Sequence, residues 1–198
     1  QITPYILSGL AVAFAFRTGL FNIGVEGQLL MGWLAAAWVG SAVDLPRIIH
    51  LPLALLAAAA AGAFWAFIVG YLKARFNVHE VISSIMLNYT ALFVMNAIIK
   101  SITDGGYKTE TVSESATLRW QWLREFTDNS SMHLGIIVSL LMVLVMWFIL
   151  ERTTRGYELK AVGFNKNAAE YAGMSVNKNI ILAMTISGVF AGLAGAME

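Results

Sequence analysis

Cysteine, charge and an ATP-binding motif are scarce or missing in this sequence. None of the 198 residues is cysteine, which excludes a disulfide framework, a thiolate metal site and a cysteine nucleophile. Charged residues make up only 13% of the chain and sum to a net charge of +1, which excludes a strongly basic nucleic-acid-binding protein and an acidic tail protein. The phosphate-binding pattern G-x-x-x-x-G-K-[ST] is absent, so any ATP hydrolysis must be performed by another chain.

Apolar residues dominate what remains. They form 58% of the chain, and the mean hydropathy is +0.69, values that exclude an ordinary soluble globule. Six runs carry no charge at all, and most reach the roughly 17 to 25 residues that a bilayer-spanning helix needs. The predicted fold is therefore all-α, a polytopic transmembrane bundle of about six helices. The predicted helices are 3–16, 23–40, 52–72, 81–99, 134–150 and 180–197.

No soluble domain interrupts these runs, so 1–198 is expected to be a single transmembrane domain. Gln1 stands in an apolar run that shows no basic segment and no small-residue cleavage site, so we do not expect this run to be a signal peptide. The last run breaks off at Glu198 just after a glycine-rich stretch. We expect the domain to be a fragment of a longer protein, truncated at both ends.

Lysine and arginine indicate the orientation, because cytoplasmic connections hold the excess of these residues. Placing 151–179 in the cytosol puts eight of the 13 on that side and five on the other, where 100–133 becomes an acidic extracytoplasmic loop. The eight are Arg17, Lys73, Arg75, Arg152, Arg155, Lys160, Lys166 and Lys178.

A glycine-rich break separates the first two apolar runs. Gly19, Gly24 and Gly27 all lie within it, and each glycine weakens a helix by about 1 kcal/mol relative to alanine. Irregular backbone at membrane depth persists only where protein buries it or where it lines a wet cavity. The break at 17–28 therefore indicates a cavity or a tight protein contact.

Polar side chains in this break are candidates for lining a solute pathway. Asn22 and Glu26 are four residues apart, which on a helix places them on one face, and Gln28 follows. A carboxylate near the hydrocarbon costs on the order of 2 to 3 kcal/mol and marks a pathway or a fixed partner. Glu26 thus either lines the route, or holds the hairpin by pairing with Arg17 or by capping a neighbouring helix end.

Two asparagines in 81–99 add to these candidates. Asn88 and Asn96 are eight residues apart and fall on roughly one face of a helix. They either face the pathway or bond a neighbouring helix, and the spacing does not distinguish the two.

A short capped helix is predicted in the second polar connection. Asn167 and Glu170 have the spacing of a capping box, and Gly173 stands where a left-handed residue ends a helix. A helix of about six residues is marginal in water, so it either docks against a partner or forms a surface turn. Ala168, Ala169 and Ala172 would give it a small, smooth face.

Three segments resemble one transporter family. Residues 9–32 (GLAVAFAFRTGLFNIGVEGQLLMG), 78–89 (VHEVISSIMLNY) and 155–174 are similar to ABC-importer permeases of the ribose and branched-chain amino acid superfamily, in the nucleoside branch. The resemblance implies a type II importer fold and location in the bacterial cytoplasmic membrane. It also implies ATPase coupling by the loop residues Gly163, Asn165, Asn167, Ala168, Ala169, Glu170, Ala172, Gly173 and Met174.

The same resemblance implies a set of partners. They are two cytosolic ATPase subunits, a second permease subunit, an extracytoplasmic substrate-binding lipoprotein and membrane lipid, with no nucleic acid. The permease would transport nucleosides by alternating access and have no catalytic site, cofactor or metal of its own. Simple sugars and branched-chain amino acids remain alternative substrates.

Two rival functions follow from the residues alone. An intramembrane zinc protease would need a second histidine four residues after His79, and Ser83 stands there instead. An ion-coupled secondary transporter also uses broken helices and polar midplane residues, and it differs in needing no ATPase chain.

Overall fold

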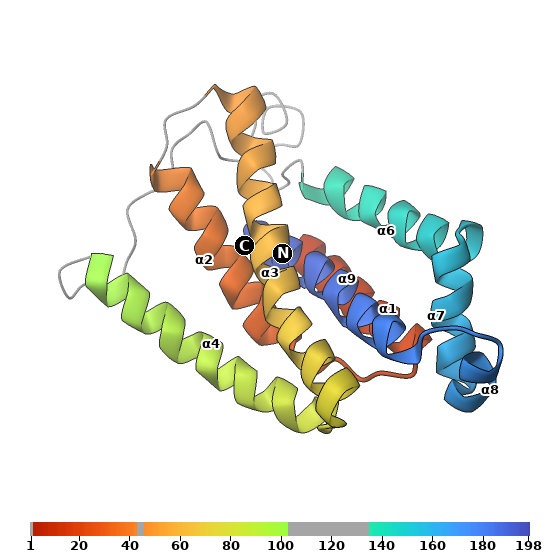
Figure 1. Cartoon of the computed structure of the whole chain (residues 1–198). Coiled ribbons are helices and arrows are strands. Elements are labelled where there is room, and N and C mark those ends of the chain that lie inside the picture. Colours follow the sequence, from red (N-terminus) through yellow and green to blue (C-terminus); the bar gives the residue numbers. More distant parts are fainter. Residues whose placement is uncertain (1, 43–45, 103–134) are drawn as a thin grey trace.

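The computed structural model describes residues 2–42, 46–102 and 135–198. Every helix or strand in these ranges is an α-helix, which confirms the predicted all-helical class (Figure 1). The helices are α1 (Ile2–Arg17), α2 (Val25–Ala42), α3 (Arg47–Phe76), α4 (Glu80–Ile102), α6 (Gly135–Arg152), α7 (Thr154–Phe164), α8 (Lys166–Tyr171) and α9 (Val176–Ala196).

Four of these helices, α3, α4, α6 and α9, are long and apolar enough to cross a membrane. α1 is a shorter apolar helix, and α2 adds a further 18 residues. All six predicted spans are therefore helical, as expected from the uncharged runs. α3 is the least well predicted, because it begins at Arg47 and continues through Pro52 to Phe76.

α9 forms the centre of the bundle. Within its most apolar stretch 67% of the residues are buried, compared with 17% for α6 at the periphery. Its neighbours are α1, α2 and α3, and Phe14 of α1 packs against Phe190 with ring centroids 5.9 Å apart. The core therefore lies along the last predicted span.

Glycines allow α2, α3 and α9 to meet backbone to backbone. A Cβ placed on Gly32 of α2 or on Gly62 of α3 would lie 2.6 Å from the Cα of Gly192 in α9. Gly188 and Gly195 make similarly close approaches to α3 and α2. Because lipid supplies no hydrophobic drive between helices, such close backbone packing is a main source of association energy.

The cationic residues gather at one end of the bundle, where α7 and α8 lie (Figure 1). The eight that the sequence assigns to the cytosol lie in the last turns of α1, α3 and α6, in α7 and α8, and in the first turn of α9. In the described residues the opposite end carries only Arg47 and Lys100. The positive-inside rule therefore predicts that the α7–α8 end faces the cytoplasm. Most of the expected outer loop, 103–133, lies outside the described residues.

The connection 151–179 is more helical than the sequence suggested. α7 occupies its first half, and the Thr153 side chain caps it by accepting a hydrogen bond of 3.0 Å from Gly156 N. Residues 154–164 mix polar and apolar types, so the search for long apolar runs missed this helix. Leu159 and Val162 are fully buried, which fixes α7 against the bundle.

Candidate functional site

The break between α1 and α2 begins with a Schellman motif. Gly19 has a φ of 70°, its N–H bonds Phe16 O at 3.0 Å, and Leu20 N bonds Ala15 O at 3.1 Å. These bonds satisfy the last carbonyls of α1 and turn the chain. The predicted irregular segment is therefore present, and α2 does not resume until Val25.

After the turn at Gly19, residues 20–22 lead the chain back into the bundle. Leu20 and Asn22 are buried, whereas Phe21 between them is exposed. Irregular backbone at this depth needs protein around it, and residues 18–22 have that cover on one side.

Asn22 reaches the midpoint of α9. Its Nδ2 donates to Ser187 Oγ at 2.8 Å, and Ser187 is 11 residues after Val176, or about 16 Å along the helix axis. α2 therefore starts near the middle of the bundle rather than at its surface.

Asn22 is the centre of a buried hydrogen-bond network. Its Nδ2 also donates to Gln28 Oε1, and its Oδ1 accepts from Gln28 Nε2 and from Gly24 N, each at 3.0 Å. Ser187 Oγ in turn donates to Ala11 O at 2.6 Å. Asn22 is 1% exposed, and Gln28 and Ser187 are fully buried. The network joins α1, the break, α2 and α9 at one point.

A second amide holds the start of α2 from the other side. Asn88 of α4 accepts from Gly27 N at 3.0 Å and donates to Ile23 O at 3.1 Å. It thereby satisfies one N–H in the first turn of α2 and one carbonyl of the break. Trp65 of α3 donates to Leu87 O at 3.2 Å beside it, so three helices fix this position.

The predicted pathway residues thus fall into two groups. Asn22 and Gln28 are buried inside the chain, and Asn88 is half-buried in contact with α2, whereas Glu26 and Asn96 are exposed. The interpretation that Asn22 and Glu26 share a helical face is wrong, because the helix begins only after Asn22. Among the described residues Glu26 forms no ion pair, so the alternative pairing with Arg17 is not seen.

Ser187 is the network member that sequence reasoning missed. We expect Ser187→Ala to lower the free energy of unfolding by about 1 to 3 kcal/mol, because it removes the buried hydrogen bond to Ala11 O and one of the two acceptors of the Asn22 Nδ2 group. Thermal unfolding of the purified permease measures this cost. Thr185→Val is the matched control: Thr185 Oγ1 bonds only Ile181 O of its own helix, so this variant should change little. Equal effects of the two variants would contradict the role of the network.

The short helix predicted near Asn167 is present as α8, with a different cap. Asn165, not Asn167, caps it by accepting from Ala168 N at 3.1 Å, and Asn167 lies inside the helix. The capping-box interpretation of Asn167 and Glu170 is therefore wrong. The cap lies at Asn165 because α7 continues to Phe164, which leaves Asn165 as the one residue between the two helices.

The end of α8 agrees with its prediction. Gly173 has a φ of 81°, its N–H bonds Glu170 O at 2.9 Å, and Met174 N bonds Ala169 O at 3.0 Å. This is a second Schellman motif. α8 is therefore a six-residue helix, Lys166–Tyr171, that is capped at both ends.

The exposed face of α8 differs from the predicted one. Ala169 is 3% exposed and packs against the chain itself, whereas Ala168, Glu170 and Ala172 are exposed. Two aromatic side chains flank the helix, Phe164 at 90% and Tyr171 at 98% exposure, and sequence reasoning did not select them. The remaining coupling candidates lie in α8 or next to it: Asn165, Asn167 and Gly173 are exposed, and Gly163 and Met174 are half-buried.

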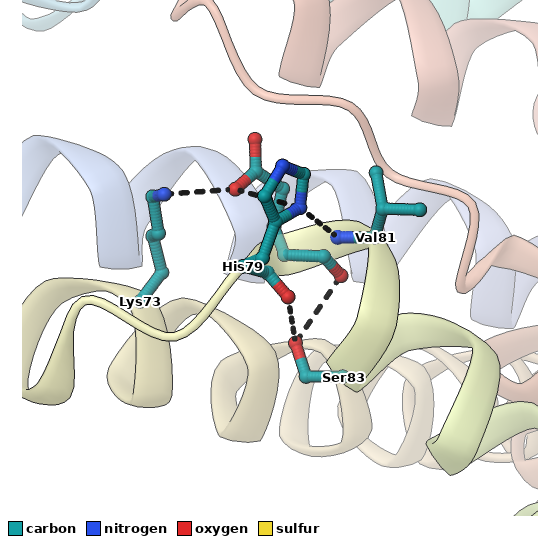
Figure 2. A network of polar contacts seen from close by, with 5 residues as sticks. Lys73, His79, Val81 and Ser83 are labelled. Carbon is teal, nitrogen blue, oxygen red and sulfur yellow. Dashed lines mark hydrogen bonds and ion pairs between the residues drawn. The ribbon is translucent and has the colours of Figure 1, made fainter.

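A polar network closes the turn between α3 and α4 at the same end of the bundle (Figure 2). Lys73 Nζ lies 3.0 Å from Glu80 Oε2, and Ser83 Oγ donates to His79 O at 3.3 Å and to Glu80 O at 3.2 Å. His79 Nδ1 accepts from Val81 N at 3.4 Å. His79 and Glu80 therefore take part in helix-end contacts, and the described residues contain no group of three metal-binding side chains.

Comparison with known proteins gives relatives of one kind. The chain is 66% identical to the guanosine ABC transporter permease protein NupP of Bacillus subtilis, covering all of this chain and 57% of that protein. It is 40% identical to the nucleoside ABC transporter permease protein NupB of Lactococcus lactis, covering 98% of this chain and 56% of that protein. It is 37% identical to the glucose ABC transporter permease protein TsgB13 of Haloferax volcanii, covering all of this chain and 54% of that protein.

The chain spans a little over half the length of these curated relatives. No solved structure matches it. Its full length, residues 1–198, matches the family described as branched-chain amino acid transport system / permease component. With its apolar spans and this match, the chain is a multi-pass membrane protein, and it belongs to that permease family.

Proposed function

We propose that this chain is the core of a permease subunit in an ATP-driven nucleoside importer of the bacterial cytoplasmic membrane. The observation that carries the proposal is the 66% identity to a guanosine permease over the whole chain. The permease moves solute by alternating access and carries out no covalent chemistry. Two cytosolic ATPase subunits, a second permease subunit and a substrate-binding lipoprotein complete the machine.

Substrate class is the first point to test. The two nucleoside-permease relatives are 66% and 40% identical and the glucose permease 37%, which favours nucleosides over simple sugars. The experiment measures uptake of radiolabelled guanosine, glucose and leucine in a strain that lacks the full-length protein, with and without the gene restored. ATP-dependent guanosine uptake supports the proposal. Uptake of glucose or leucine alone would reassign the substrate, and uptake that persists without the ATPase would indicate an ion-coupled transporter.

The face formed by α2 and α4 is the proposed position of the pathway. Glu26 lies in the first turn of α2, close to mid-depth, and Asn96 lies on α4; both are exposed. Glu26 is also the only charged residue in 18–43. A bare carboxylate facing lipid is costly, so this face lines an aqueous route or meets the second permease. This proposed face is held in position by Asn22, Gln28 and Asn88, whose hydrogen bonds fix the start of α2.

We expect Glu26→Gln to lower nucleoside uptake by about tenfold, the equivalent of about 1.4 kcal/mol. The reason is that the change removes the one charge on the pathway face and its favourable interaction with the start of α2. Transport assays in proteoliposomes check this, with copurification of the ATPase subunits as the measure of intact assembly. Unchanged uptake would remove Glu26 from the pathway, and loss of assembly would assign it a structural role.

α8 is the proposed docking site for an ATPase subunit. It lies at the cationic end of the bundle and is capped at both ends. Its last residue, Tyr171, and Phe164 at the end of α7 are both exposed to solvent. Exposed aromatic residues outside the apolar spans are typical of protein interfaces. The small exposed side chains of Ala168 and Ala172 between them leave room for the walls of a cleft in the partner.

A further inference from the structure

α7 is attached to three other helices. At its start, a Cβ on Gly156 would lie 2.6 Å from Leu150 Cα of α6, so α6 and α7 touch through their backbones. In its middle, Glu158 Oε2 accepts a bond of 3.2 Å from Asn179 Nδ2 of α9. At its end, Gly163 meets the last residue of α1. α7 is therefore held along its whole length.

The contact at Gly163 is made by backbone on both sides. A Cβ on Gly163 would collide with Arg17 O and lie 3.1 Å from Thr18 C. In the reverse direction, a Cβ on Gly19 would lie 3.3 Å from Gly163 O. No side chain separates the two segments, so a displacement of either one reaches the other without being absorbed by rotamer changes.

A single residue joins α7 to α8. Asn165 N bonds Ala161 O of α7 at 3.0 Å, and Asn165 Oδ1 accepts from Ala168 N of α8 at 3.1 Å. The same residue thus ends one helix and begins the next. A joint that is hydrogen-bonded on both sides leaves few backbone angles free to change, so α8 and α7 move together.

The residues after Gly19 connect this contact to the centre of the bundle. The short segment 20–22 ends at Asn22, whose side chain is fixed by Gln28 and Ser187. The turn at Gly19 lies against Gly163 at one end of this segment and Asn22 is hydrogen-bonded at the other, so the two contacts lie only three residues apart in the chain. The start of α2, with the exposed Glu26, lies directly after it.

We propose that α7 transmits movement of α8 to the start of α2 through the Gly163 contact with residues 17–19. This inference rests on the proposed function, since it requires an ATPase that moves α8. It places the transmitting contact in α7 and the break, and not only in the direct connection from α8 through Gly173 to α9. Gly163 is a positioning residue: it acts on the pathway through the segment 18–22.

The test uses the full-length permease with its partner subunits in proteoliposomes. An environment-sensitive dye on Phe21→Cys, an exposed position in the segment, reports its movement when ATP binds. Gly163→Ala places a methyl group against Arg17 O. Gly9→Ala is the matched control, because a Cβ there meets nothing within 4 Å. A diglycine insertion between Phe164 and Asn165 is the second variant, which loosens the joint and leaves the Gly163 contact in place.

For Gly163→Ala we expect ATP hydrolysis within about twofold of the parent, uptake reduced at least about tenfold, and loss of the dye response. The insertion lies beside Phe164 of the docking site, so its dye response is measured in preparations that retain the ATPase subunits on copurification. In these that response should be lost, whereas Gly9→Ala should behave like the parent. Normal uptake and a normal dye response in either test variant would overturn the proposal. If Gly163→Ala does not assemble, the dye response of the insertion variant tests the proposal instead. A parent that shows the dye response but no nucleoside uptake would instead contradict the proposed substrate and leave this inference supported.

Discussion

Gly192→Leu is expected to prevent the permease from folding. Gly192 lies where three helices meet: a Cβ there would collide with Ala58 O of α3, and Gly32 and Gly62 approach its backbone from α2 and α3. A leucine must push both neighbours away from α9, the most buried helix. Overpacking at a single contact costs about 1 to 3 kcal/mol, so two contacts should cost about 2 to 6 kcal/mol of unfolding free energy.

Size-exclusion chromatography of the detergent-extracted full-length protein measures this effect, as does its thermal unfolding. The folded peak should disappear for Gly192→Leu. Gly9→Leu is the control in α1, where the added side chain has open space around it, and its peak should remain. If Gly192→Leu retains a folded peak with an unchanged unfolding temperature, the close packing of α2, α3 and α9 is not what holds the bundle together.

Phe164→Ala combined with Tyr171→Ala is expected to abolish most ATP-driven uptake. Both aromatic rings are almost wholly exposed on either side of α8. Aromatic residues that anchor an interface typically contribute about 2 kcal/mol or more each. Losing both would weaken ATPase binding by roughly a hundredfold or more. Uptake in proteoliposomes and copurification of the ATPase subunits measure the loss.

Tyr157→Ala is the matched control for this variant. Tyr157 is 64% exposed on α7, about two turns before α8, and it is not assigned to the docking face. It should retain ATPase binding and uptake, and all three proteins should unfold at similar temperatures because none of the rings is buried. If the double variant still binds the ATPase normally, α8 is not the docking element in the form proposed.

The helices of the bundle were predictable because membrane spans must exclude charge. Each uncharged run in the described residues became a helix, and the glycine-rich break appeared where backbone propensity placed it. α7 was missed because only three of its residues, Gly156, Leu159 and Val162, are buried, and such a helix needs no long apolar run. Its strongest local signal is the cap at Thr153, which is visible in the sequence only once a helix is suspected.

The candidate site was only partly predictable, because its contacts join distant parts of the chain. Asn22 was selected from its own neighbourhood, but its partner Ser187 lies 165 residues later, and a lone serine in an apolar helix gives no signal. For Asn88 the spacing allowed either a position facing the pathway or a bond to a neighbouring helix, and the structure shows a hydrogen bond to α2. The cap of α8 was placed two residues too late, because the choice of Asn165 depends on where α7 ends.

Contact between α8 and an ATPase subunit is the central claim, and cysteine cross-linking tests it most directly. The 198 residues contain no cysteine, so Ala168→Cys places the single thiol of this segment on the exposed face of α8, whereas Ala169 is too buried to serve. The parent importer without this substitution is the control for thiols elsewhere in the assembly. With a short thiol-to-amine cross-linker and the assembled importer, a permease–ATPase adduct is predicted. The absence of any adduct in a preparation that takes up nucleosides at a normal rate would contradict the account.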